Sequence, residues 1–284
     1  MYTLKKRENG FEYLELQNSV AHAKIALQGA HIFEYKREKE EDLLWLSTES
    51  FFEKGKAIRG GVPICWPRFG TLDESMPAHG FSRTAMFTLV EVLETKVDLT
   101  EVRFLLTGDE QSRKIWNHKF ELEVIFSIGE SLEIELKTKN CESEEFMITQ
   151  ALHSYFCVSD ISHVKIKNLD KKPYFDALLG KTFFQKGDVT FEKEVDRVYQ
   201  EVDTIVVLED KKRVVHVQNS GSSSVVVWNP WCEKATRLAG MRDVDYKEFV
   251  CIESANAFDD FRVIKAGETH SLKVSLSTSS KTVL

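Results

Sequence analysis

Alternation between apolar and polar residues dominates the chain and predicts β-strands. Phe120–Ile128 is apolar at every second residue, and the same period returns in Leu132–Leu136 after the link Gly129–Ser131. Because the side chains of a strand point to opposite faces in turn, this pattern predicts two half-buried strands. The short link that contains glycine predicts a β-hairpin between them.

Similar apolar-rich runs recur along the chain, with turn residues between them. They are His22–Leu27, Glu101–Leu106, His163–Ile166, Thr204–Leu208, Val214–Val217, Val225–Trp228, Phe249–Ile252 and Leu272–Leu276. Helical periodicity is rare, and we expect short helices only near Glu49–Lys56 and Trp231–Leu238. The run Asn219–Ser224, rich in Ser and Gly, is interpreted as a hairpin turn. Many short strands separated by turns predict an all-β fold, a large antiparallel sandwich with a few short helices.

Composition narrows the class of protein. The 284 residues show no repeat, linker or change of composition, which favours a single domain over residues 1–284. The net charge of −7 opposes nonspecific binding to nucleic acid or to an anionic membrane. No run approaches the roughly 18 apolar residues that a membrane span needs, and the N-terminus lacks a signal-peptide pattern. Without an exposed apolar stripe, we expect a monomer.

The cysteines and the missing motifs limit the chemistry further. Five cysteines, an odd number with no CxxC pair, favour a reduced, cytoplasmic protein and weaken zinc and redox interpretations. HExxH, P-loop, GxGxxG and GxSxG motifs are absent from the sequence. We therefore expect neither a metal nor a nucleotide cofactor.

Residues 59–83 hold three arginines and one histidine in a chain of net negative charge. Arg59, Arg68, His79 and Arg83 are separated there by glycines and prolines, which prevent a regular helix. Because guanidinium groups present planar forks of donors, such a loop suits a phosphate or carboxylate ligand. A network of surface salt bridges would account for the same residues.

Three further segments carry candidate acids and bases. As one strand, Thr149–Val158 would place His153 beside Tyr155 on the face opposite the core, although a buried structural histidine fits the same pattern. Glu253 is expected to end an apolar strand just before a turn, as either a solvated charge or a general base. Asp196 could cap a turn, pair with a neighbouring arginine or bind sugar hydroxyls.

Six segments in this order resemble the aldose 1-epimerase (galactose mutarotase-like) superfamily, in its glucose-6-phosphate 1-epimerase branch. They are LQGAH (27–31), RGGVPICWPRFG (59–70), HGFSR (79–83), ALHSYFCVSD (151–160), VWNPW (227–231) and VCIESAN (250–256). The resemblance implies a large antiparallel supersandwich with a sugar site on its concave face and with no metal or organic cofactor. The implied partner is a small phosphorylated hexose.

The resemblance also implies roles for individual residues. His153 matches the family's general acid, and Glu253 matches its general base. The implied substrate ligands are Arg59 and Arg83 for the phosphate, His79 near the sugar, and Asp196 for sugar hydroxyls. Arg68 stands where the family often has an aromatic residue or Gln, so it is either an added phosphate contact or a surface charge.

These roles predict an isomerase that interconverts the α and β anomers of a hexose 6-phosphate by opening and closing the ring. The geometry expected is an imidazole and a carboxyl that face each other across a space wide enough for one hexose. A non-catalytic module that binds a sugar or sugar phosphate is the alternative on the same fold. A glycoside hydrolase is a further alternative, but such enzymes usually need two carboxylates.

Overall fold

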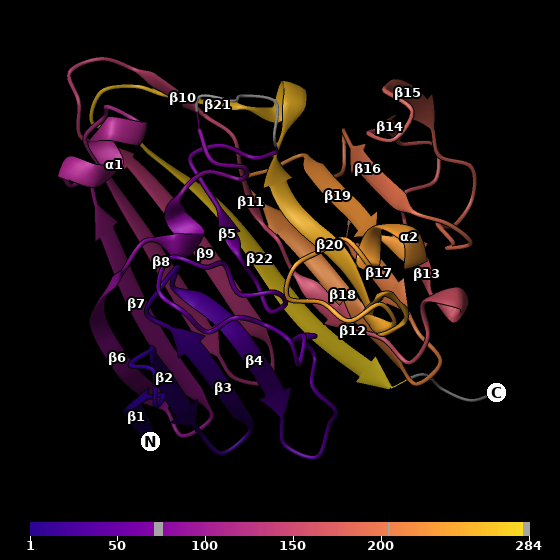
Figure 1. The fold of residues 1–284 in the computed structure, drawn as a ribbon, viewed down its shortest axis with the longest axis horizontal. Coiled ribbons are helices and arrows are strands. Elements are labelled where there is room, and N and C mark those ends of the chain that lie inside the picture. Colours follow the sequence, from indigo (N-terminus) through magenta and orange to yellow (C-terminus); the bar gives the residue numbers. More distant parts are fainter. Residues whose placement is uncertain (71–75, 204, 281–284) are drawn as a thin grey trace.

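Antiparallel strands are the dominant secondary structure of the computed structural model, which describes residues 1–70, 76–203 and 205–280 (Figure 1). Within these residues, one eight-stranded sheet has the order β13 (Lys165–Lys167), β17 (Val206–Glu209), β18 (Arg213–Ser220), β22 (Thr269–Ser280), β9 (Leu132–Asn140), β8 (Phe120–Ile128), β7 (Leu99–Thr107), β6 (Thr88–Lys96). The second has the order β15 (Lys181–Phe184), β14 (Pro173–Asp176), β16 (Val195–Tyr199), β19 (Ser224–Asn229), β20 (Phe249–Asn256), β11 (Gln150–Leu152), β5 (Ile64–Cys65), and β12 (Tyr155–Cys157) also pairs with β20.

Smaller elements complete the described part of the chain. An N-terminal sheet consists of β1 (Tyr2–Lys6), β2 (Glu12–Gln17), β3 (Ala21–Ala26) and β4 (His31–Arg37), and a two-stranded ribbon of β10 (Phe146–Ile148) and β21 (Arg262–Ile264). The helices are α1 (Glu110–Ile115) and α2 (Trp231–Ala235), and the 3-10 turns are η1 (Ser82–Thr84), η2 (Ile161–His163), η3 (Asp245–Lys247) and η4 (Phe258–Asp260). None of the described helices is long and apolar enough to cross a membrane.

The main core lies between the sheets. Alternate residues of β8 and β9 are buried, as the period-two pattern predicts, and the two strands pair from Phe120↔Asn140 to Ile128↔Leu132. Val124 of β8, Ile252 of β20 and Leu14 of β2 belong to the same buried cluster. The predicted all-β sandwich with a few short helices is therefore confirmed.

Several local predictions are wrong. Glu49–Lys56 forms turns instead of a helix, while the predicted helix near Trp231–Leu238 is present as the shorter α2. Asn219–Ser224 is not a hairpin turn, because β18 before it and β19 after it belong to different sheets. Helix α1 was not predicted, although Asp109 caps it by accepting a hydrogen bond from the Ser112 N–H. Thr204, at the start of one predicted strand, lies outside the described residues.

The second sheet carries a smaller apolar cluster on the face that turns away from the main core. Tyr155, Trp228, Phe249 and Cys251 belong to this cluster. Tyr155 pairs with Cys251, which pairs with Trp228, so these side chains form a row across neighbouring strands. This row is the floor on which the candidate site is built.

Candidate active site

His153 lies at a break between β11 and β12, where the sequence predicts one continuous strand. Its N–H donates to the Pro63 carbonyl (3.0 Å), while the carbonyl of the next residue, Ser154, accepts from the Ile252 N–H (3.2 Å). The predicted faces nevertheless hold, since Leu152 and Phe156 lie in the main core. The His153 ring stacks on that of Tyr155, with centroids 4.8 Å apart and planes 14° apart.

Glu253 lies inside β20 rather than at its end, because the strand continues through Asn256. Ala255 pairs with Ala151 there, so the turn predicted after Glu253 is wrong. Alternation along β20 directs Ile252 into the main core and Cys251 into the floor cluster. Glu253 therefore points to the same face as His153.

The two side chains predicted as acid and base are neighbours. His153 Nε2 lies 3.3 Å from Glu253 Oε1, and their side chains are only 12% and 2% exposed. They do not stand on either side of a space the width of a hexose, as the sequence interpretation expected. This contact still suits chemistry at one carbon, because the hydroxyl oxygen and the ring oxygen of a pyranose are both bonded to C1.

Burial shifts the two pKa values in opposite directions. Burial holds the pKa of His153 well below its ordinary value, and the nearby charges of His79, Arg59 and Arg83 lower it further. Burial raises the pKa of Glu253 well above its ordinary value, and the Asp196 carboxylate adds to that rise. A carboxylate beside an imidazole favours the charged imidazole, and the loss of solvent opposes that effect here. Each group is biased toward its neutral form.

Arg59 reaches the same place from the loop before β5. Its Nη1 donates to Tyr155 Oη (3.3 Å) and its Nη2 to the Ala239 carbonyl (3.4 Å). Three buried polar atoms, among the described residues, lack a hydrogen-bond partner at this site: Arg59 Nε, His153 Nδ1 and Glu253 Oε2. Buried polar atoms are nearly always hydrogen-bonded, so this group of orphaned atoms marks the place where a polar ligand would bind.

His79 and Arg83 lie on the other side of His153. The His79 ring centroid is 5.9 Å from that of His153, and its Nδ1 accepts from the Gly70 N–H (3.4 Å). Burial, together with the charges of Arg83 and Arg59, lowers the pKa of His79 to about 4. Arg83 Nη2 donates to the Ala78 carbonyl (2.6 Å). The structure therefore gathers Arg59, His79 and Arg83 around the imidazole of His153.

A glycine fixes the shape of this loop. Gly80 has a φ of +72°, and a Cβ built there would lie 2.1 Å from the Trp66 carbonyl oxygen. Only glycine fits such a close approach in the left-handed region. Arg68 is on the same loop and partly exposed, next to Phe69, whose ring centroid is 5.2 Å from that of His79. A phosphate contact by Arg68 stays a prediction.

Asp196 enters the site from β16, where it pairs with Trp228 of the floor. Burial raises the pKa of Asp196, and Lys234 opposes that rise. The Lys234 ammonium lies 3.7 Å from Asp196 Oδ2. Sequence reasoning missed Lys234, because nothing in its local pattern distinguishes it from a solvated lysine on a short helix.

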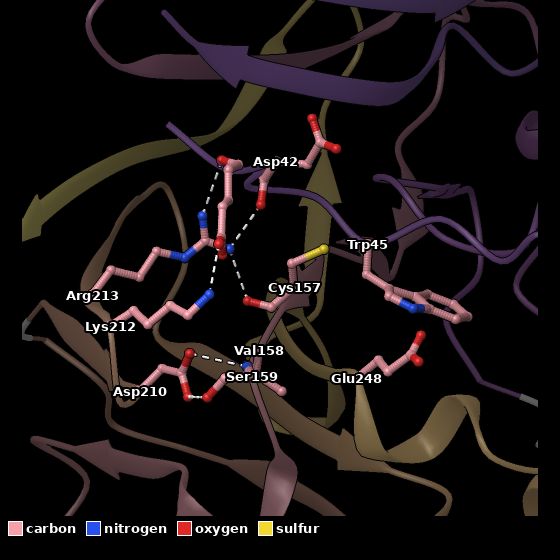
Figure 2. A pocket seen from close by; sticks show the side chains of 10 residues that line it. Asp42, Trp45, Cys157, Val158, Ser159, Asp210, Lys212, Arg213 and Glu248 are labelled. Atoms are coloured by element: carbon pink, nitrogen blue, oxygen red, sulfur yellow. Dashed lines mark hydrogen bonds and ion pairs between the residues drawn. The ribbon is translucent and has the colours of Figure 1, made fainter. Parts of the chain in front are cut away.

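A separate pocket of about 290 Å³ borders Trp45, and neither His153 nor Glu253 lines it. Figure 2 shows several of its polar groups in contact with one another: Arg213 donates to the carbonyls of Asp42 (2.7 Å) and Cys157 (2.9 Å). Asp210 accepts from the hydroxyl and the N–H of Ser159. These contacts hold chain segments together. In the described residues, no three His, Cys, Asp or Glu side chains converge as metal ligands would.

Comparison with known proteins identifies the family of the chain. The family model described as aldose 1-epimerase matches residues 12–277. A protein of Escherichia coli K12 named "Putative glucose-6-phosphate 1-epimerase" is 38% identical over 253 residues, covering 87% of this chain and 84% of its own. A protein of the same name from Cenchrus ciliaris is 34% identical, covering 96% and 87%. The crystal structure of a "putative mutarotase (YeaD)" from Salmonella typhimurium superposes with a TM-score of 0.91 at 33% identity, covering 99% and 94%.

Proposed function

Because the chain belongs to the aldose 1-epimerase family, we propose that it interconverts the α and β anomers of a hexose 6-phosphate, glucose 6-phosphate first among them. The names of the relatives from E. coli and Cenchrus ciliaris support the choice of substrate. The observation that carries the proposal is the contact of His153 and Glu253 among buried polar atoms without partners.

In the proposed reaction, Glu253 accepts the proton of the C1 hydroxyl while His153 donates a proton to the ring oxygen. The C1–O5 bond breaks, its electron pair goes to the ring oxygen, and C1 becomes an aldehyde carbon. Rotation about C1–C2 presents the other face of the carbonyl, and the reverse transfers close the opposite anomer. A positioned acid and a positioned base typically contribute about 10²–10⁴-fold each.

The protonation of the pair suits a reversible reaction. With one proton between them, His153 and Glu253 are either imidazolium and carboxylate or imidazole and carboxylic acid. Both forms are neutral overall, so burial does not forbid either one. Each form offers one donor and one acceptor to the two oxygens on C1. The pair can therefore act on either anomer, and it titrates as a unit rather than as two independent groups.

Arg59 and Arg83 are proposed to bind the 6-phosphate, and Asp196 to bind sugar hydroxyls. The phosphate is remote from C1, so its binding energy anchors the ring without taking part in bond breaking. His79, with Nδ1 occupied by the Gly70 N–H, would offer Nε2–H to the substrate. Arg68, on the same loop, is proposed as an additional phosphate ligand.

The direct test follows freshly dissolved α-glucose 6-phosphate by optical rotation or by the NMR signals of the two anomers. The protein should speed the approach to equilibrium well above the rate in buffer alone. Tight binding of the sugar phosphate with no acceleration would instead identify the non-catalytic binding module.

A monomer in the cytoplasm is proposed as the working state. The five cysteines are free thiols, with Cys65 and Cys251 buried, which fits a reducing compartment. Light scattering of the purified protein tests the monomer directly.

A further inference from the structure

Asp196 lies among other acidic groups. Its side chain is 27% exposed, and its strand β16 is flanked by β14 and β19, with β20 one strand further on. The titratable and charged groups that face it or neighbour it are Glu194 and Arg197 of its own segment, Asp176 of β14, Glu253 and Cys251 of β20, and Lys234 of α2. Because like charges disfavour ionisation, Glu194 and Asp176 act with burial to raise the pKa of Asp196.

Lys234 supplies the opposing charge. Its Nζ lies 2.7 Å from Glu194 Oε1 and 3.7 Å from Asp196 Oδ2, and 5.9 Å from the Trp228 ring centroid. Arg197, the other nearby cation, is directed instead to Asp176, with Nε 3.7 Å from Oδ2. Among the described residues, Lys234 is thus the cation whose ion pair reaches Asp196.

The turn that carries Lys234 is held firmly. Asn229, at the end of β19, is buried and donates from Nδ2 to the carbonyls of Tyr246 (2.8 Å) and Phe249 (2.9 Å). Its Oδ1 accepts from the Trp231 N–H (2.9 Å), which fixes the first residue of α2. Lys234 follows three residues later, so its position relative to β16 is set by the sheet.

We propose that Lys234 is a positioning residue that keeps the Asp196 carboxylate ionised and directed at the sugar, and so sets the affinity for hexose hydroxyls. This inference rests on the proposed function, in which Asp196 binds those hydroxyls. An ionised carboxylate accepts hydrogen bonds from two hydroxyls more strongly than a carboxylic acid does. Removing the ammonium would favour protonation of Asp196 and release its side chain.

Binding is measured by calorimetry with 1,5-anhydroglucitol 6-phosphate, which lacks the anomeric hydroxyl and cannot react. Lys234→Met should weaken this binding about tenfold, equivalent to losing one charge-assisted hydrogen bond. Lys234→Arg should restore most of it. Binding of inorganic phosphate, which needs only the arginines, should stay unchanged in both variants.

The pH dependence separates this role from a merely structural one. In Lys234→Met, the pKa of Asp196 rises, so the acid-side fall in kcat/KM should move to higher pH. In Glu194→Gln, a neighbouring negative charge is lost, so the same fall should move to lower pH. If the Lys234 side chain served only to pack the turn, Lys234→Met would leave the acid-side fall at its wild-type pH.

A double-mutant cycle identifies the partner through which Lys234 acts. In an Asp196→Asn background, Lys234→Met should cause little further loss of affinity. Lys172→Met is the matched control, since Lys172 also forms an ion pair, at 2.6 Å with Asp203, away from the site. Additive losses, or unchanged binding in Lys234→Met, would overturn the inference. The proposed function would still hold if the wild-type protein exchanged the anomers. Absence of exchange in the wild type would instead reject the proposed function.

Discussion

At the scale of single residues, the site is built from groups whose burial costs the folded protein free energy. Glu253 and His153 each retain a buried atom without a hydrogen-bond partner, in the part of the chain that the structure describes. An unsatisfied buried polar group typically costs about 1–3 kcal/mol. Functional sites commonly keep such unfavourable groups because the chemistry requires them.

Glu253→Gln should abolish most of the exchange activity yet stabilise the protein. The pKa of Glu253 is raised in the folded protein, so the protonated carboxyl stabilises the fold relative to the unfolded state. This contribution is complete below the pKa of the unfolded state and is lost as the pH rises through the pKa of the folded state. Gln keeps the shape without this loss. Thermal unfolding at pH 8 should therefore show a higher Tm, with about 2–4 °C gained for each kcal/mol. The gain should shrink toward pH 4, and a lower Tm for the variant at pH 8 would contradict the assignment.

Arg83→Ala should raise KM for glucose 6-phosphate by about tenfold or more, because a charge-assisted contact to the phosphate is lost. Exchange of free glucose anomers should hardly change. Arg103→Ala is the control, since Arg103 lies on β7, in the other eight-stranded sheet, and pairs with Glu91 of β6. Equal losses for the two sugars would dismiss a phosphate role for Arg83.

At the scale of elements, alternation predicts which way side chains point better than it predicts where strands end. The faces of Leu152, Tyr155 and Ile252 follow from the period of two, because one face must pack against the core. The break at His153 does not follow, since it depends on a hydrogen bond to Pro63, distant in sequence. The path of Asn219–Ser224 likewise depends on which sheet receives the next strand, and local turn chemistry does not determine this.

The candidate site likewise divides into residues that the sequence predicts and residues that only the structure reveals. The proposed acid–base pair and the arginines were predicted through motifs whose order resembles a known family. Lys234 was not, because its role depends on the placement of α2 beside β16. The direct contact of His153 and Glu253 also needed the structure, since pairing of β11 and β12 with β20 sets the distance between them.

Gly80→Ala should destabilise the loop that carries His79 and Arg83. The new Cβ would meet the Trp66 carbonyl, and we expect a loss of at least about 2 kcal/mol in the free energy of unfolding, with raised KM. Gly267→Ala is the matched control, because Gly267 has a φ of +75° but nothing within 4 Å of its Cβ position. A chemical denaturation series compares the two. Equal losses would show that the close approach at Gly80 is unimportant.

At the scale of the whole molecule, the sheets share one core built from distant parts of the chain. β22, near the C-terminus, lies between β18 and β9 in the middle of its sheet (Figure 1). Leu272 of β22, Leu14 of β2 and Phe156 of β12 belong to one buried cluster. The floor of the candidate site rests on this core. It therefore keeps the proposed acid and base in a fixed relation, which favours catalysis more than positioning by flexible loops would.

The shared core predicts that residues 1–284 unfold as one domain. Thermal transitions followed by far-ultraviolet circular dichroism and by tryptophan fluorescence should coincide. Two separated transitions would mean that the N-terminal sheet or another part folds independently of the rest.

The most direct measurement of the central claim is the rate of anomer exchange in α- and β-glucose 6-phosphate, observed by exchange NMR at neutral pH. Wild-type protein should exchange the anomers rapidly, whereas His153→Ala and Glu253→Gln should each lose about 10²–10⁴-fold while still binding the sugar phosphate. Exchange at nearly the wild-type rate in either variant would contradict a reaction carried by these two side chains.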